Sequence, residues 1–279
     1  MAFSPKRLDQ LQRGTVVVVG VPTDENSTFM RGSALAPARI REVMNEGSSN
    51  LCSESGIDLS GELRFQDLGD LEFTSARDAI RQIEEDVGVL LNRGAYVIAL
   101  GGDHAVTYPI MKAYHQHYEV LSVLHLDAHP DLYEDYEGNR YSHACPFARI
   151  IEEGLATRVI QVGVRNINPH QRAQAKRFGV EMIEMRDFRP GIVLDLEGPL
   201  YLSVDMDVLD PAFAPGVSHH EPGGLSTREV LGIIQAIRVP VVGADIVEFN
   251  PKRDPLGITA MVSFKFLKEI AARMIELNE

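Results

Sequence analysis

Residues 120–131 read Val-Leu-Ser-Val-Leu-His-Leu-Asp-Ala-His-Pro-Asp, an apolar run that gives way to a cluster of acidic and imidazole side chains. A short run of this kind, rich in Val and Leu, is typical of a strand that is buried on both faces of a parallel sheet. In open parallel sheets, ligands bind beyond the carboxyl ends of the strands. This stretch therefore predicts a buried strand and a polar site that begins where the strand ends.

Similar apolar runs recur along the chain and alternate with segments of helical spacing, in which apolar side chains are three or four residues apart. The predicted strands cover residues 15–21, 95–100, 120–126, 158–164, 179–184, 200–204 and 239–246. The predicted helices cover residues 36–45, 75–93, 109–117, 146–153, 227–237 and 263–277. This alternation indicates βαβ units and a mostly parallel sheet with helices on both faces. Without any internal repeat or linker, residues 1–279 are expected to form one domain.

Composition and charge exclude several classes of protein. The formal net charge is −13 and no basic cluster is present, which argues against a nucleic-acid partner. No apolar run approaches the ~20 residues that a membrane span needs. Only two cysteines occur, and residues 1–7 lack the apolar core of a secretory signal, so the expected location is the cytoplasm. The acidic balance favours a cationic substrate, although most acidic proteins are acidic only for solubility.

Acidic and imidazole side chains follow four of the predicted strands. They are His104 after the second strand, Asp127, His129 and Asp131 after the third, Asp205 and Asp207 after the sixth, and Asp245 and Glu248 near the end of the seventh. Because alternate residues of a strand share a face, the two Asp-x-[Asp/His] patterns are expected to converge. A single Asp after a strand is more often a turn former or a helix cap. The combination of several such residues favours a shared site instead.

The types of side chain in this cluster suggest a metal centre. Carboxylates and imidazoles packed together without cations would repel one another and would be costly to desolvate. Four carboxylates and two imidazoles without a thiolate suit Mn²⁺ better than a structural zinc ion, although Co²⁺, Ni²⁺ or Fe²⁺ could replace it. Four aspartates balance two divalent ions, and a water between two such ions would lose its proton near neutral pH. The sequence therefore predicts two Mn²⁺ per chain and a hydrolytic reaction.

Three motifs resemble those of the ureohydrolase (arginase/agmatinase) family, and the resemblance covers nearly the whole chain. They are Gly101-Gly102-Asp103-His104, Leu126-Asp127-Ala128-His129-Pro130-Asp131, and Ser203-Val204-Asp205-Met206-Asp207-Val208-Leu209-Asp210-Pro211. The resemblance implies a three-layer α/β/α sandwich around an eight-stranded parallel sheet, assembled as trimers or hexamers. It also implies a small cationic guanidino substrate that is hydrolysed to urea and an amine.

The resemblance assigns roles to individual residues as well. His104, Asp127, Asp131 and Asp205 would hold one Mn²⁺, and Asp127, His129, Asp205 and Asp207 would hold the other, so that Asp127 and Asp205 bridge. His143 is similar to the family histidine that passes a proton to the leaving amine. A lone histidine, however, is more often a packed or surface residue. Glu248 is similar to the carboxylate that binds the guanidinium, and it could otherwise be a helix N-terminal acid.

The identity of the substrate stays open between two family activities. Tyr133 and Asn168 stand where animal arginases carry Asn and an acid, which favours agmatine, while residues 141–150 and 215–219 resemble plant-type arginases. Agmatine hydrolysis to putrescine and urea is therefore the first expectation, and arginine hydrolysis is the alternative. His219 and His220 replace a common Thr-Pro, and His219 could contact the substrate or only line the rim.

Two other classes of protein remain as alternatives. The chain could be an inactive scaffold that binds metal or partners, but a scaffold would not need the complete set of ligand, proton-shuttle and guanidinium positions. It could also be a deacetylase of related fold, but these enzymes generally use one catalytic metal, and the complete ligand set for a second ion argues against that. Because both alternatives are disfavoured, the prediction is a dimanganese hydrolase.

Overall fold

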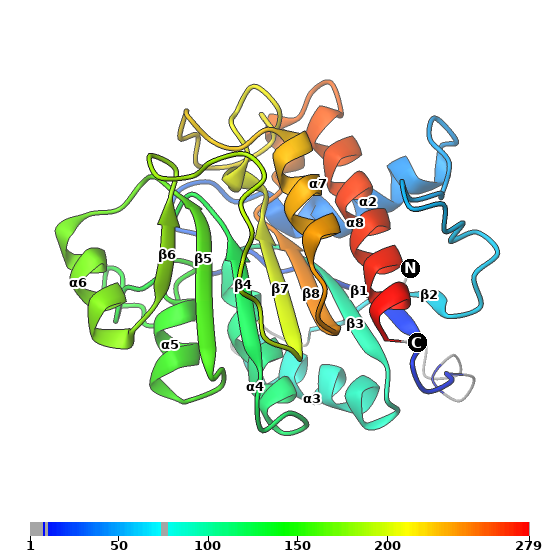
Figure 1. The fold of residues 1–279 in the computed structure, drawn as a ribbon, viewed down its shortest axis with the longest axis horizontal. Helices are drawn as coiled ribbons and strands as arrows, with labels where there is room; N and C mark the ends of the chain where they lie inside the picture. Colours follow the sequence, from blue (N-terminus) through cyan, green and yellow to red (C-terminus); the bar gives the residue numbers. More distant parts are fainter. Residues whose placement is uncertain (1–7, 9–10, 74–77, 279) are drawn as a thin grey trace.

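The fold is built around one eight-stranded sheet in a computed structural model, which describes residues 8, 11–73 and 78–278 (Figure 1). The strands are β1 (Val16–Val21), β2 (Phe65–Asp70), β3 (Tyr96–Gly101), β4 (Ser122–Leu126), β5 (Arg158–Val164), β6 (Glu181–Glu184), β7 (Leu200–Asp205) and β8 (Val241–Val247). Their order in the sheet is β2-β1-β3-β8-β7-β4-β5-β6, and every pair of neighbours is parallel. The prediction of a parallel α/β sheet is confirmed.

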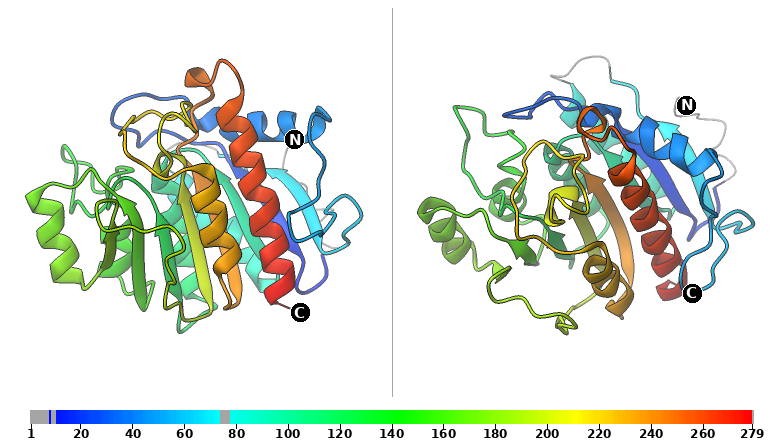
Figure 2. Two further views of the ribbon diagram at one scale, coloured as in Figure 1. Left: turned by 45° about the horizontal axis from the view of Figure 1, so that its top comes forward. Right: turned by 90° about the horizontal axis from the view of Figure 1, so that it is seen from above.

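Helices cover both faces of this sheet. They are α2 (Ala36–Asn45), α3 (Ala79–Asn92), α4 (Thr107–His115), α5 (Pro146–Glu152), α6 (Pro169–Phe178), α7 (Thr227–Ala236) and α8 (Ile258–Leu277). Helices α2, α7 and α8 pack on one face, and α3, α4 and α5 pack on the other (Figures 1 and 2). Among the described residues, no helix is both long enough and apolar enough to cross a bilayer. The result is the predicted three-layer sandwich.

One hydrophobic core lies on each face of the sheet, and this explains why the strands are continuous apolar runs in the sequence. In β1, Val16 and Val18 join the core under α2, α7 and α8, whereas Val17 and Val19 join the core under α3, α4 and α5. Because successive side chains of a strand point to opposite faces, a strand covered on both sides is apolar at most positions. All six residues of β1 are buried.

Two elements were not identified from the sequence. Strand β2 contains Asp67, Gly69 and Asp70 and lies at the edge of the sheet, where one side has no neighbouring strand, so it lacks the apolar run of a central strand. Helix α6 is mostly polar, but its ends carried usable signals. Asn168 caps its first turn by accepting a hydrogen bond from the Gln171 N–H, and Gly179 ends it in the left-handed conformation.

Some predicted boundaries also need correction or cannot be compared. The last helix begins at Ile258, five residues before the predicted start at residue 263. The predicted helix over residues 75–93 begins at Ala79 among the described residues, and residues 75–77 lie outside them. Residues 1–7, which were expected to lack the apolar core of a secretory signal, also lie outside the described residues.

The strand order brings the ends of four separate strands together. Strands β3, β8, β7 and β4 are consecutive neighbours in the middle of the sheet, although they are far apart in the sequence. Since the strands are parallel, all four carboxyl ends lie at one edge, which is at the top of Figure 1 and faces the viewer in the right panel of Figure 2. These are the four strands whose ends carry the predicted polar side chains.

Candidate metal centre and pocket

The predicted site residues lie at or beyond the carboxyl ends of these four central strands. His104 begins a short 3₁₀ helix after β3, and Asp127, His129 and Asp131 follow β4. Asp205 is the last residue of β7, Asp207 lies in the 3₁₀ helix that follows, and Glu248 is the first residue after β8. Gly102 permits the turn before His104, because a Cβ atom there would lie 1.8 Å from the Thr23 carbonyl oxygen.

Three carboxylates surround the imidazole of His104. Its Nδ1 atom lies 3.2 Å from Asp127 Oδ2, 3.1 Å from Asp131 Oδ2 and 3.3 Å from Asp205 Oδ2. All four side chains are buried. Burial alone would lower the pKa of His104, but the three nearby carboxylates raise it well above the usual value. The cluster therefore strongly favours a positive charge at its centre.

A second imidazole lies on the other side of Asp127. His129 Nδ1 is 3.5 Å from Asp127 Oδ1 and 3.1 Å from Asp207 Oδ2. Asp127 thus presents Oδ2 to His104 and Oδ1 to His129, which places this one carboxylate between two potential cation sites. Ligand atoms of Asp127, His129 and Asp207 all lie within 4.8 Å of one another.

The residues converge, but not for the reason that the sequence suggested. Strand β4 ends at Leu126, so Asp127, His129 and Asp131 lie in the loop beyond it and not on one face of a strand. Asp131 has a positive φ of 52°, which no regular strand contains. Asp207 likewise lies in a 3₁₀ turn, where its backbone N–H donates to Asp205 Oδ1 at 2.8 Å. Turns, and not strand alternation, bring these carboxylates together.

The hydrogen bonds of His104 test whether the site fits a metal ion. Ser203 Oγ donates to Asp245 Oδ1 at 2.7 Å, so the same oxygen must accept from His104 Nε2–H, at 2.9 Å. In the neutral ring this arrangement leaves a lone pair on Nδ1, and that buried atom has no hydrogen-bond partner among the described residues. A lone pair that faces three carboxylates fits a divalent cation, since imidazole and carboxylate together are common metal ligands.

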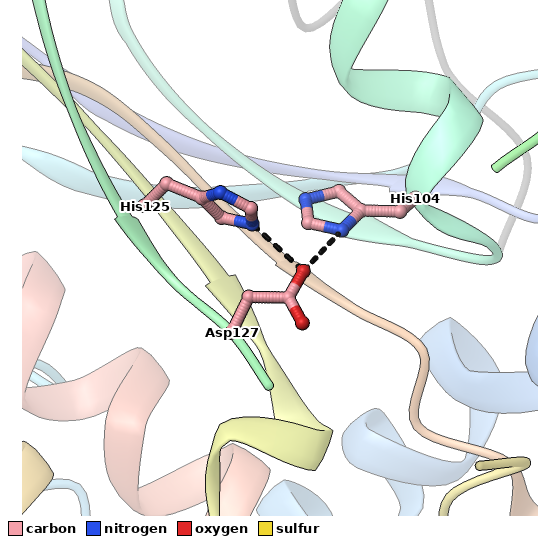
Figure 3. Close-up of side chains that lie close together, drawn as sticks. All are labelled: His104, His125 and Asp127. Carbon is pink, nitrogen blue, oxygen red and sulfur yellow. Dashed lines mark hydrogen bonds and ion pairs between the residues drawn. The ribbon is translucent and has the colours of Figure 1, made fainter. Parts of the chain in front are cut away.

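His125 lies next to this site but is oriented away from a ligand role. Its Nε2 atom is 2.7 Å from Asp127 Oδ2, the same oxygen that His104 Nδ1 faces (Figure 3). The ring stacks on Phe147 with centroids 3.8 Å apart and is fully buried. His125 is therefore a packed residue of the core that also contacts Asp127.

His143 and Glu248 form a buried pair beside the ligand cluster. His143 Nδ1 lies 2.7 Å from Glu248 Oε1, which also accepts the His104 backbone N–H at 2.9 Å. Burial alone would lower the pKa of His143, but the charge of Glu248 and the hydrogen bond to it raise that pKa to about 9. Glu248 has a positive φ of 63°, and such backbone strain in a non-glycine residue is frequent at functional sites.

Thr28 is a contact of His143 that the sequence did not reveal. Its Oγ1 atom lies 2.8 Å from His143 Nε2, and its backbone N–H points at the same nitrogen from 3.2 Å and can donate to it when the ring is neutral. The neighbouring Asn26 carbonyl accepts the His143 backbone N–H at 3.1 Å. The loop after β1 therefore holds both the side chain and the backbone of His143, and no local signal near residue 28 predicts this long-range contact.

A pocket of about 240 Å³ opens above the cluster. The lining includes His129, Asp131, His143, Asp205, Asp207 and Glu248, together with Thr28, Tyr133, Asn168 and His219. The His219 ring lies 5.8 Å from that of His129 and 5.5 Å from that of His143, so it forms a wall of the pocket. His220 instead points to the Pro215 carbonyl oxygen and is exposed. The two adjacent histidines therefore have different surroundings.

A comparison with known proteins identifies the family. The model described as "Arginase family" matches residues 14–272 of the chain. The chain belongs to the arginase family. A mitochondrial arginase 1 from Arabidopsis thaliana is 47% identical to this chain, and the match covers 94% of this chain and 82% of the relative. An arginase structure from Medicago truncatula has a TM-score of 0.88 and 42% identity, covering 93% of this chain and 87% of that one. An agmatinase from Bacillus anthracis is 37% identical over 93% of this chain and 91% of the relative.

These comparisons confirm the family resemblance and correct one expectation about this arginase-family chain. The predicted cytoplasmic location is wrong, because plant arginases that match the chain at 42–47% identity carry mitochondrial or chloroplastic in their names. They point to an organelle. Composition could not reveal this, since a low cysteine content and an acidic balance are equally compatible with either location.

Proposed function

We propose that the protein is an arginase, which hydrolyses arginine to ornithine and urea with two Mn²⁺ ions. The observation that carries the proposal is the arrangement of two imidazoles around Asp127, below a pocket whose wall contains His143 and Glu248. Membership of the arginase family supports amidine hydrolysis. The greater identity to plant arginases than to the Bacillus agmatinase favours arginine, the alternative substrate of the sequence analysis, over agmatine.

The proposed roles follow from where each side chain lies. His104, Asp127, Asp131 and Asp205 would hold one ion, and Asp127, His129, Asp205 and Asp207 the other. Two ions bound by these residues would supply an activated water and stabilise the negative charge that develops during hydrolysis. Carboxylate and imidazole ligands suit Mn²⁺, which is the metal that we propose.

Glu248 and His143 would act on the substrate itself. A carboxylate can accept two N–H groups of a planar guanidinium, and Glu248 lies in the pocket wall where it would hold that group above the ligand cluster. Water adds its oxygen to the guanidinium carbon, the bond from that carbon to the alkyl-bearing nitrogen breaks, and urea and an amine result. The amine nitrogen must gain a proton. With a pKa raised to about 9, His143 is protonated at neutral pH and can donate that proton.

The outer wall of the pocket is polar, which supports a substrate with an amino-acid end. Asn168 Nδ2 donates to the Tyr133 hydroxyl at 2.6 Å, and both residues line the pocket together with Asn166 and Gln171. Tyr133 and Asn168 were the residues that favoured agmatine, because they differ from animal arginases. They also provide amide and hydroxyl groups that could bind the ammonium and carboxylate of arginine.

Measurement of urea release tests this proposal. Mn²⁺-loaded protein is expected to hydrolyse arginine with a kcat/KM at least roughly tenfold above that for agmatine, since a polar wall rejects a substrate that lacks its hydrogen-bonding groups. A sample treated with a chelator is the control and should release no urea. A preference for agmatine would replace arginase by agmatinase. If neither compound releases urea, the enzymatic proposal is wrong and the alternative of a non-catalytic scaffold is favoured.

A substitution at Thr28 tests its role in orienting His143. Thr28→Val keeps the branched shape but removes the hydroxyl, and kcat for arginine is expected to fall roughly tenfold, the scale of losing an outer hydrogen bond to a functional group. Thr28→Ser restores the hydroxyl and should retain kcat within about threefold. Steady-state urea assays give both values. A Val variant with unchanged kcat, or a Ser variant as slow as Val, would show that the hydroxyl does not orient His143.

A further inference from the structure

Four buried polar side chains form a row across four adjacent strands beneath the ligand cluster. The strand register aligns Gln161 of β5 with His125 of β4, His125 with Ser203 of β7, and Ser203 with Asp245 of β8. All four are completely buried. Burying a polar group without a hydrogen bond costs free energy of folding. Four buried polar groups in one row of a hydrophobic sheet therefore suggest a specific function for their hydrogen bonds.

The bonds of the row run outward to two different residues of the cluster. At one end, Asp245 accepts from Ser203, Thr107 and Tyr201, at 2.7, 2.8 and 2.8 Å, and Ser203 in turn accepts from His104. At the other end, Gln161 contacts His125, and His125 contacts Asp127. One half of the row therefore fixes an imidazole of the cluster, and the other half fixes its central carboxylate.

The direction of hydrogen bonding in the second half is set by the Pro130 carbonyl. Gln161 Nε2 lies 2.7 Å from that oxygen, which can only accept, so the amide nitrogen and not the amide oxygen must face this side. The same nitrogen lies 3.0 Å from His125 Nδ1, which must therefore accept as well. With Nδ1 as an acceptor, the hydrogen of the neutral ring is on Nε2 and points at Asp127 Oδ2.

This orientation leaves one atom of the Gln161 side chain unpaired. The Gln161 Oε1 atom is buried and has no hydrogen-bond partner in the described part of the chain. Leaving a buried carbonyl oxygen unpaired costs free energy, and an apolar residue of similar size would avoid that cost. Only the donor side of the amide makes contacts, which fits a role in holding His125 and the backbone at Pro130.

We propose that Gln161 and His125 are positioning residues for the metal centre, and that they fix the orientation of the Asp127 carboxylate between its two cation sites. The proposal rests on the proposed function only in taking Asp127 as a shared ligand. His125 donates to Asp127 Oδ2, and the backbone N–H of His129 donates to Oδ1 at 2.6 Å. Because both oxygens are held, the carboxylate has its bridging geometry before any ion binds, which is how outer hydrogen bonds raise metal affinity.

The other possibility is that His125 itself binds a metal ion. Ligand atoms of His104, His125 and Asp127 lie within 4.8 Å of one another, so distance alone would allow it. The geometry argues against this, because Nδ1 is engaged by Gln161 and Nε2 by Asp127, so neither nitrogen has a free lone pair directed at the cluster. Stacking on Phe147 further fixes the ring in place.

Two substitutions at His125 separate a positioning role from a packing role. His125→Phe keeps an aromatic ring for stacking on Phe147 but removes the donor to Asp127. His125→Gln removes the ring but places an amide N–H near the position of Nε2. We expect the Mn²⁺ affinity of the Phe variant to fall roughly 10- to 100-fold, the usual range for a lost outer partner of a ligand, with the Gln variant near the wild type. Competition with a chelating dye gives the affinities, and electron paramagnetic resonance detects the magnetically coupled Mn²⁺ pair.

The outcomes decide between the alternatives without any activity measurement. Wild-type affinity and coupling in the Phe variant would overturn the proposal, and so would their loss in the Gln variant alone, which would indicate a packing role. Loss of one ion from both variants would make His125 a ligand and would also overturn it. If the Phe variant does not fold, Gln161→Leu replaces it, with the same expected loss. Absence of urea release with the expected metal pattern would refute the proposed function but not this inference.

Discussion

Asp127→Asn is expected to release both metal ions and to lower kcat/KM for arginine by roughly 10³-fold or more, the scale of losing a central electrostatic group. Asp127 presents one oxygen to His104 and the other to His129, so each ion would lose a charged ligand in this variant. Asparagine keeps the size and the hydrogen-bonding shape of the side chain. Metal analysis after dialysis gives the number of ions, and the urea assay gives the activity.

Asp207→Asn is the matched control for this experiment. Asp207 lies 3.1 Å from His129 Nδ1 and has no corresponding contact with His104, so its removal should weaken only the ion beside His129. Retention of about one ion per chain is the expected result. Full metal content in the Asp127 variant would contradict its central position, and loss of both ions from the Asp207 variant would show that the two sites cannot be occupied separately.

His143→Asn is expected to lower kcat by roughly 10²-fold or more while both ions stay bound, because a positioned acid–base group contributes about that much. Within the described part of the chain, the His143 side chain hydrogen-bonds to Glu248 and Thr28 and to none of the proposed metal ligands, so metal content should not change. The polar asparagine side chain limits the disturbance to the neighbouring Glu248. Turnover of arginine and metal analysis on the same sample measure the two effects.

A histidine outside the site provides the control for that variant. His115 is exposed at the end of α4, and His115→Asn should retain both kcat and metal content. A His143 variant that turns over as fast as the control would exclude His143 from proton transfer. A His143 variant that loses an ion would instead assign it to the metal centre.

The local pattern predicted the elements with strong periodicity and missed those without it. The apolar runs of β1, β3 and β4 and the spacing in α3 depend on burial of a whole face, which the sequence records directly. The edge strand β2 buries less of its surface, and α6 has a weak apolar face, so neither has a strong pattern. The single domain and the trimer or hexamer stay predictions, although both hydrophobic cores share one sheet.

The sequence predicted the residues of the candidate site but not the residues that hold them in place. Asp, His and Gly at the ends of apolar runs pointed to His104, Asp127 and Asp205 because such side chains rarely follow several strands without a ligand. Gln161, which lies inside a strand, looks in the sequence like an isolated polar residue. Its role depends on the register with His125, which is a property of the assembled sheet.

The sequence by itself determined that four strands end in carboxylate and imidazole groups, because the type of each side chain and its place after an apolar run are local properties. Only the tertiary structure decided that β8 and β7 lie between β3 and β4, which makes those four ends neighbours. It also decided that Thr28 reaches His143 across 115 positions of the chain. The physical reason is that strand order and register arise from hydrogen bonds and packing between distant segments, and these contacts leave no periodic trace in either segment alone.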